Sequence, residues 1–132
     1  MGKYILKDGI SLDGLKPKFK AKLLALIESL TFNVIIVSAL RDRAGQTVCY
    51  LKFLAGLGPP ANRPGTSSHE GSPPDGKGSA ADVHPLCPVD EKAARFRAMQ
   101  RTCEKFGLKN VQKEPWHYQD SDWIKPKGEG VR

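Results

Sequence analysis

Cysteine is scarce in this sequence, and long apolar runs are missing. The three cysteines, Cys49, Cys87 and Cys103, are odd in number and far apart, which argues against a disulfide framework and against a cysteine zinc site. We therefore expect free, mostly buried thiols. No segment approaches the roughly 18 apolar residues of a membrane span. Residues 1–8 lack the apolar block of a secretory signal, so we expect synthesis in the cytoplasm without a signal peptide.

Acidic residues are fewer than basic ones, 14 against 21, which gives a formal net charge of +7. Such an excess attracts polyanions, among them anionic cell-wall polymers and nucleic acid. The sequence has neither a recognition helix nor an aromatic platform interleaved with arginine, so we expect no specific nucleic-acid partner. Only Lys16, Lys18, Lys20 and Lys22 cluster, and we interpret them as a solvated face.

The length of 132 residues suits one domain with its own core, and we expect a single domain, residues 1–132, and a monomer. Residues 1–14 read as an arm with a short strand at 4–6. Pro17 suits a first helical turn. An apolar stripe at three- and four-residue spacing follows it: Phe19, Leu23, Leu26, Ile27 and Leu30. Residues 32–38 form a β-branched run, apolar on both faces, which predicts a central strand.

A second helix is expected from near Arg43 to Leu57, with its apolar residues directed inward and Gly56 or Gly58 ending it: Val48, Leu51, Phe53 and Leu54. A third helix should begin at an Asp90 cap and stop at Gly107. Strands are expected at 79–83, 108–112 and 116–119, the last two as a hairpin, before a basic tail over 121–132. These elements predict an α+β fold, a small, mostly antiparallel central sheet flanked by about three helices.

Two distant segments carry the residues with chemical potential. His69 and Asp82 lie in the first, and Glu114 and His117 in the second. A catalytic zinc ion takes three protein ligands and leaves its fourth position to water. We therefore expect one zinc ion per chain on His69, Asp82 and His117, with Glu114 free to take a proton from that water. Because Pro115 interrupts strand alternation, we expect Glu114 in a turn that swings it toward the metal.

The long proline- and glycine-rich segment 58–78 is interpreted as an active-site loop because it contains His69. Arg41 follows the buried strand, which favours a place in the cleft. Two residues compete as ligands. His84 shares a strand face with Asp82, and Asp75 offers a carboxylate, although a Pro-Pro-Asp-Gly turn also explains it.

Three short motifs together resemble the signature of VanX/VanY-type D-alanyl-D-alanine metallopeptidases, a group that includes phage L-alanyl-D-glutamate endolysins and the hedgehog signalling domain. The motifs are Ser67-x-His69, Gly78-x-Ala80-x-Asp82 and Glu114-x-Trp116-His117. Residues 64–69 resemble the VanY form in particular. Upstream, Ser38-Ala39-Leu40-Arg41 with Gln46 is similar to the family's Ser-Gly-Tyr-Arg and its later Gln. The resemblance covers residues 15–118. One departure is that His69 and Asp82 are 13 positions apart, further than usual, which indicates a loop excursion within Glu70–Lys77.

The resemblance implies a hedgehog/DD-peptidase-like fold and a zinc peptidase that hydrolyses peptidoglycan stem peptides as a D-Ala-D-Ala carboxypeptidase. Arg41 would stabilise the oxyanion or grip a substrate carboxylate. Ser67 and Gln46 would hold the polar ends of the substrate. We expect Trp116 either in the core or in the cleft wall, where it would help to bind the substrate. Two alternatives stay open. One is an endolysin that cuts the L-Ala-D-Glu bond of the cell wall after holin release, and the other is a non-catalytic, zinc-binding hedgehog-like module, against which Glu114 argues.

Overall fold

The computed structural model describes residues 1–41, 43–59, 61–62, 67–71, 75–111 and 113–124. Five strands form one sheet in the order β1-β2-β3-β5-β4. β1 runs parallel to β2, and every other neighbouring pair is antiparallel. The strands are β1 (Tyr4–Leu6), β2 (Val34–Ser38), β3 (Ala80–Pro85), β4 (Leu108–Val111) and β5 (Glu114–Asp120). The expected α+β fold is confirmed, as are the interior position of β2 and the pairing of β4 with β5.

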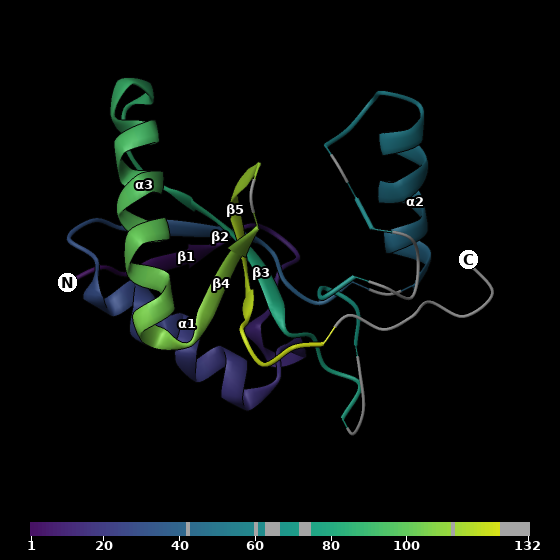
Figure 1. Cartoon of the computed structure of the whole chain (residues 1–132), viewed down its shortest axis with the longest axis horizontal. Coiled ribbons are helices and arrows are strands. Elements are labelled where there is room, and N and C mark those ends of the chain that lie inside the picture. Colours follow the sequence, from purple (N-terminus) through teal and green to yellow (C-terminus); the bar gives the residue numbers. More distant parts are fainter. Residues whose placement is uncertain (42, 60, 63–66, 72–74, 112, 125–132) are drawn as a thin grey trace.

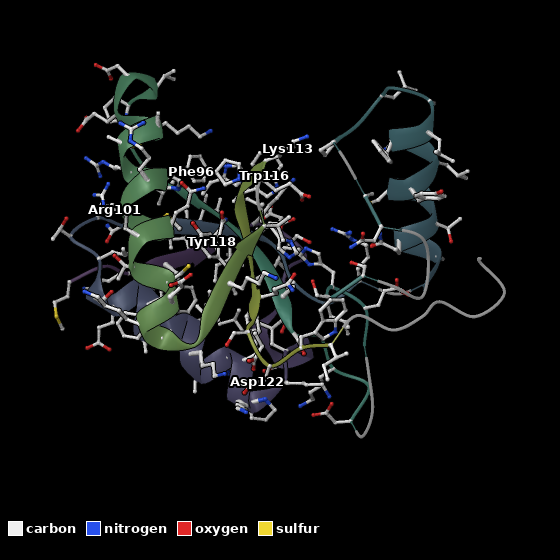
Figure 2. The ribbon with its side chains drawn as sticks, viewed as in Figure 1. Phe96, Arg101, Lys113, Trp116, Tyr118 and Asp122 are labelled. Carbon is white, nitrogen blue, oxygen red and sulfur yellow. The ribbon has the colours of Figure 1, made fainter. Side chains whose placement is uncertain are left out.

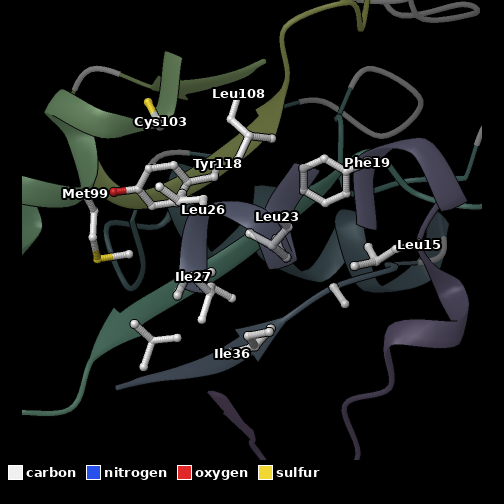
Figure 3. Close-up of a cluster of buried hydrophobic side chains, with 14 of the residues drawn as sticks. Leu15, Phe19, Leu23, Leu26, Ile27, Ile36, Met99, Cys103, Leu108 and Tyr118 are labelled. Carbon is white, nitrogen blue, oxygen red and sulfur yellow. The ribbon is translucent and has the colours of Figure 1, made fainter. Parts of the chain in front are cut away.

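Helices α1 (Pro17–Ser29) and α3 (Lys92–Cys103) pack together against the sheet (Figure 1). The expected apolar stripe of α1 is confirmed, since all five of its residues are buried. They meet Ile36 of β2, Met99 of α3 and Tyr118 of β5 in one core, shown in Figure 3. Full burial of a large apolar side chain contributes roughly 1.5–3 kcal/mol, so this core holds β3 and β5 in place.

The helix α2 (Arg43–Leu54) stands apart from the sheet in Figure 1. The expectation that its apolar residues point inward is wrong, because Val48, Leu51, Phe53 and Leu54 are 51, 57, 39 and 62% exposed. Periodicity within a helix indicates which side chains share a face, but it does not supply a core for that face to cover. The helix ends before Gly56, whose φ of +74° lies in the left-handed region that glycine adopts without strain.

The start of α3 also differs from expectation. Asp90 lies in a short 3-10 turn, Val89–Glu91, and Glu91 occupies the cap position of α3 without a side-chain hydrogen bond. The predicted Asp90 cap is therefore wrong, because the 3-10 turn itself leads the chain into the helix. Gly107, with a φ of +76°, follows the 3-10 turn Glu104–Phe106 at the other end of α3 and does stop the helical segment.

Lysines of α1 and of the residue before it tie distant segments together. Lys16 contacts Asp75 at 2.7 Å, Lys18 contacts Asp122 at 2.6 Å, and Lys22 contacts Asp120 at 2.7 Å. The three cysteines are free, as expected, although Cys49 and Cys87 are only partly buried. Among the described residues, no helix combines the length and apolar character needed to cross a membrane. Of the expected basic tail, residues 125–132 lie outside the described part.

Candidate metal centre

The sheet brings the two chemically important segments together. Strands β3 and β5 are antiparallel neighbours, and Asp82 and His117 stand opposite each other in their register. His69 approaches from the loop, where its carbonyl accepts a hydrogen bond from the Arg41 N–H at 2.7 Å. The Ser79 N–H donates to the Ser68 carbonyl at 3.1 Å, which fastens the other side of this loop segment to the start of β3. Residues from three parts of the chain thus meet at one end of β3.

Three potential ligand atoms converge there. Nε2 of His69 lies 3.2 Å from Oδ1 of Asp82 and 3.1 Å from Nδ1 of His117, and the last two atoms are 3.4 Å apart. A tetrahedral zinc ion with bonds of about 2.0–2.1 Å has ligand atoms about 3.3 Å from one another. The three side chains therefore fit three corners of a zinc tetrahedron, and they are the group that can hold a metal among the described residues.

Hydrogen bonds on the outer sides of both rings set which nitrogen faces the centre. Nδ1 of His69 donates to the Ala39 carbonyl at 3.1 Å, since that oxygen can only accept. Nε2 of His117 donates to Oε1 of Gln119 at 2.8 Å, and the Ser68 hydroxyl donates to the same oxygen at 3.1 Å. When both rings are neutral, the lone pairs of His69 Nε2 and His117 Nδ1 then face the space between the three side chains, as metal binding requires. When a ring is protonated, the same nitrogen donates to Asp82 instead.

Asp82 and His117 shift each other's pKa. Burial raises the pKa of Asp82, but hydrogen bonds with His117 and His69 outweigh it and hold that pKa well below the usual range of a carboxyl group. Burial lowers the pKa of His117, yet the bonds to Asp82 and Gln119 prevail and raise it above its ordinary value. Asp82 is thus an anion at any physiological pH, which suits a ligand for a divalent cation.

A β-bulge in the sheet directs Glu114 toward the same centre. It is the first residue of β5 rather than part of a turn, so that expectation is wrong in its detail. The register between β4 and β5 shifts between Asn110 and Val111, so that Asn110 pairs with Tyr118 and Val111 pairs with Glu114. The bulge brings Glu114 and His117, three residues apart, into one cleft, although a regular strand would point them to opposite faces. Burial raises the pKa of Glu114, against the opposing effect of His117.

A cleft of about 490 Å³ surrounds the centre, and it is lined by all eight residues to which the sequence analysis gave a place in the site, leaving aside the two competing ligands His84 and Asp75. Besides the four residues above they are Arg41, Gln46, Ser67 and Trp116. Nη1 of Arg41 donates to Oε1 of Gln46 at 2.7 Å, and Nη2 donates to the Ser38 hydroxyl at 3.3 Å. Nε2 of Gln46 donates to the Asn62 carbonyl at 2.6 Å. The guanidinium is therefore held in place on the cleft wall, 4.0 Å from Asp82.

The two competing ligands lie elsewhere. The His84 ring stacks on Trp116 at 5.9 Å and meets Phe96 edge-on at 5.5 Å, and Figure 2 labels both aromatic residues. His84 lies on the same strand face as Asp82, two residues further along β3, but its ring packs on these two aromatic side chains and is not part of the metal-binding group of the described residues. Asp75 accepts hydrogen bonds from the side chain of Lys16 and the N–H of Lys77. Neither joins the metal-binding group of the described residues.

Sequence reasoning missed the partners that orient the histidines. Gln119 lies two residues after His117 on β5, so strand alternation puts both on one face and could have identified it. Nothing in the sequence distinguishes Ser68, or the carbonyl of Ala39, from other loop groups. Lys52 and Phe53 of α2 also line the cleft, and no sequence motif marks either of them as a site residue.

Comparison with known proteins identifies the fold. No family model matches the chain, and no curated protein matches it in sequence. Solved structures do match. The LdcB LD-carboxypeptidase, whose structure is described as revealing the basis of peptidoglycan recognition, aligns with a TM-score of 0.62 and 18% identity over 86% of this chain and 62% of its own. At such an identity, the likeness establishes the fold.

Two further structures resemble the chain to a similar degree. DacB from Streptococcus pneumoniae aligns with a TM-score of 0.57 and 22% identity, over 80% of this chain and 66% of that one. A mutant of the vancomycin-resistance D,D-pentapeptidase VanY from a VanB-type cassette, in complex with Zn(II), aligns with a TM-score of 0.60 and 18% identity, over 80% and 72%. The chain thus spans 62% of LdcB, 66% of DacB and 72% of the VanY chain.

Proposed function

We propose that this protein is a zinc-dependent peptidase that removes the terminal D-alanine from peptidoglycan stem peptides. The observation that carries the proposal is the convergence of His69, Asp82 and His117 at tetrahedral spacing, in one cleft with Glu114 and Arg41. VanY, which has this fold, is a D,D-pentapeptidase with bound Zn(II), and LdcB is an LD-carboxypeptidase that recognises peptidoglycan. These neighbours support both the choice of metal and the class of substrate.

The residues divide the chemistry among themselves. Bound zinc lowers the pKa of a coordinated water toward neutrality and polarises the scissile carbonyl. Glu114 accepts the proton of the attacking water as the new C–O bond forms, and it returns the proton to the departing amine as the C–N bond breaks. The raised pKa of Glu114 brings this carboxylate closer to neutral pH, where one group can both accept and return a proton.

Arg41 supplies positive charge on the cleft wall. Gln46 and Ser38 hold the guanidinium in place before a ligand arrives, so the side chain loses little conformational entropy when it binds an anion. A planar two-pronged donor suits either the oxyanion that develops on the carbonyl or the C-terminal carboxylate of the peptide. Ser67, whose hydroxyl accepts from the His69 N–H at 3.2 Å, lies beside the centre and offers a polar contact for the peptide.

Two measurements on the purified protein test the proposal. Elemental analysis should find one zinc per chain. Digestion of purified peptidoglycan, followed by mass spectrometry, should release free D-alanine. The length of the stem peptide that loses it distinguishes D,D- from L,D-cleavage. Loss of turbidity with release of whole stem peptides would instead indicate an L-Ala-D-Glu endopeptidase, and one bound zinc without any product would indicate a non-catalytic module.

A further inference from the structure

The wall of the cleft opposite the sheet belongs to α2. Four residues of α2 line the cleft: Gln46, Cys49, Lys52 and Phe53. Their sequence spacing of one to three residues places them on one side of the helix. The proposed mechanism uses Gln46 but none of the other three. Of these three, only Lys52 carries a formal charge. A charge in a substrate cleft influences which ligands bind there.

Lys52 has no carboxylate partner among the residues that the structure describes. By contrast, three of the four lysines between positions 16 and 22 are paired, since Lys16, Lys18 and Lys22 each lie within 2.7 Å of an aspartate. The positive charge of Lys52 is therefore available to a ligand in the cleft.

The charge balance of the cleft indicates an acidic ligand. Among its described lining residues, Arg41 and Lys52 are positive and Asp82 and Glu114 are negative. With a divalent cation bound to His69, Asp82 and His117, the cleft has two uncompensated positive charges. A peptide offers one carboxylate at its C-terminus, so a second carboxylate within the peptide is needed for electrostatic complementarity.

The spacing along α2 indicates where that second carboxylate lies. Arg41 is held by Gln46, and Lys52 follows Gln46 by six residues. At 1.5 Å per residue this is about 9 Å along the helix. An extended peptide advances about 3.3 Å per residue, so about 9 Å corresponds to roughly three residues. A peptide that places its C-terminal carboxylate at Arg41 and runs along α2 would therefore bring the residue about three positions earlier beside Lys52.

We infer that Lys52 forms a subsite for an acidic residue about three positions before the C-terminus, so that the enzyme prefers a free carboxylate there to the corresponding carboxamide. The inference rests on the proposed function. Lys52 also lies in the last turn of α2, where its positive charge interacts favourably with the negative end of the helix dipole. That structural role affects the stability of the helix but not the choice between two peptides.

The experiment compares two synthetic peptides that differ only in a carboxylate or a carboxamide at this position. The zinc-loaded wild type should show about a two- to fivefold higher kcat/KM for the acidic peptide, as expected of one ion pair with the exposed Lys52. Lys52→Arg should keep this preference, Lys52→Gln should remove it, and Lys52→Glu should reverse it. Lys109→Gln makes the same change in net charge at an exposed site outside the cleft lining and should leave the preference intact. The preference should also shrink as salt screens the pair.

A binding measurement separates this inference from the proposed function. Calorimetry with Glu114→Gln, which should bind without turnover, gives the affinity for each peptide whether or not the wild type is a peptidase. Equal affinities, no binding, or a preference that survives Lys52→Gln would overturn the Lys52 subsite. Preferential binding of the acidic peptide without any cleavage by the wild type would overturn the peptidase and leave the subsite standing.

Discussion

Oε1 of Gln119 accepts a hydrogen bond from Nε2 of His117 at 2.8 Å, from a position two residues further along the same strand. The Ser68 hydroxyl donates to that oxygen as well, so the acceptor is itself held. The bond fixes both the orientation of the His117 ring and the nitrogen that carries its lone pair. The His117 ring is therefore oriented in the absence of an ion, which would reduce the entropy lost if a metal binds there.

The first prediction concerns this partner. Gln119→Leu should lower zinc affinity by about 10- to 100-fold, because the His117 ring loses the acceptor that sets its tautomer. Gln119→Glu keeps an acceptor oxygen at the same place and should retain most of the affinity. Competition with a chromogenic chelator measures both values. Equal affinity for Gln119→Leu and the wild type would mean that Gln119 does not orient the ring.

The second prediction concerns the proposed base. Glu114→Gln should retain one equivalent of zinc, because Glu114 is outside the group of three ligands. It should lower kcat by about 10²- to 10⁴-fold, the usual contribution of a general base. Glu104→Gln makes the same chemical change on an exposed residue and should leave kcat unaltered. Near-normal turnover by Glu114→Gln would assign the proton transfer to another group.

The third prediction concerns pH. In the metal-free protein the pKa of His117 is raised, so a proton competes for Nδ1 at a higher pH than for an ordinary histidine. Asp82 is already ionised and adds no competing proton. Zinc affinity should therefore fall as pH decreases between about 8 and 5.

Protonation of His117 also affects stability, and it does so in opposite directions for the metal-free and the zinc-bound protein. Because the folded-state pKa of His117 is above its unfolded value, its contribution to metal-free stability is present at low pH and is lost as pH rises through the folded pKa. Zinc stabilises by binding the deprotonated ring. The increase in Tm on adding zinc should therefore grow from pH 5.5 to about 8, and an increase that is independent of pH would contradict the role of His117 as a ligand.

The fourth prediction concerns the core. Tyr118 is fully buried, and its hydroxyl has no hydrogen-bond partner among the described residues. Figure 3 shows this hydroxyl directed toward Met99. Burying an unsatisfied hydroxyl is unfavourable, so Tyr118→Phe should raise the free energy of unfolding by about 1 kcal/mol. Tyr50→Phe on the partly exposed α2 should change it little. Denaturant unfolding provides the comparison, and a loss of stability in Tyr118→Phe would reveal a partner for the hydroxyl.

Much of the fold could be predicted from local sequence patterns. The helix α1 follows from Pro17 and an apolar stripe, and β2 follows from a β-branched run, because both patterns arise within a few residues of each other. The environment of α2 does not follow in this way. Its apolar periodicity is real, yet Leu51 and Leu54 are exposed, since burial requires a neighbouring surface that only the path of the whole chain provides.

The candidate site shows the same difference between what local sequence predicts and what depends on tertiary structure. The identities of His69, Asp82, Glu114 and His117 could be proposed from residue chemistry and motif order, because those depend on which side chains are present. Their relation in space could not. The choice of His69 over His84 depends on the strand register and on the loop held between Arg41 and Ser79, while the position of Glu114 depends on the bulge opposite Val111.

By itself, then, the sequence determined the donor atoms, the excess of positive charge and the helix and strand periods. The tertiary structure alone decided that three donor atoms lie 3.1–3.4 Å apart, that Gln119 and Ala39 orient the two rings, and that Lys52 lines the same cleft. The physical reason is that a side chain's chemistry belongs to the residue, whereas coordination geometry depends on distances between segments that only the packed sheet and its loops bring together.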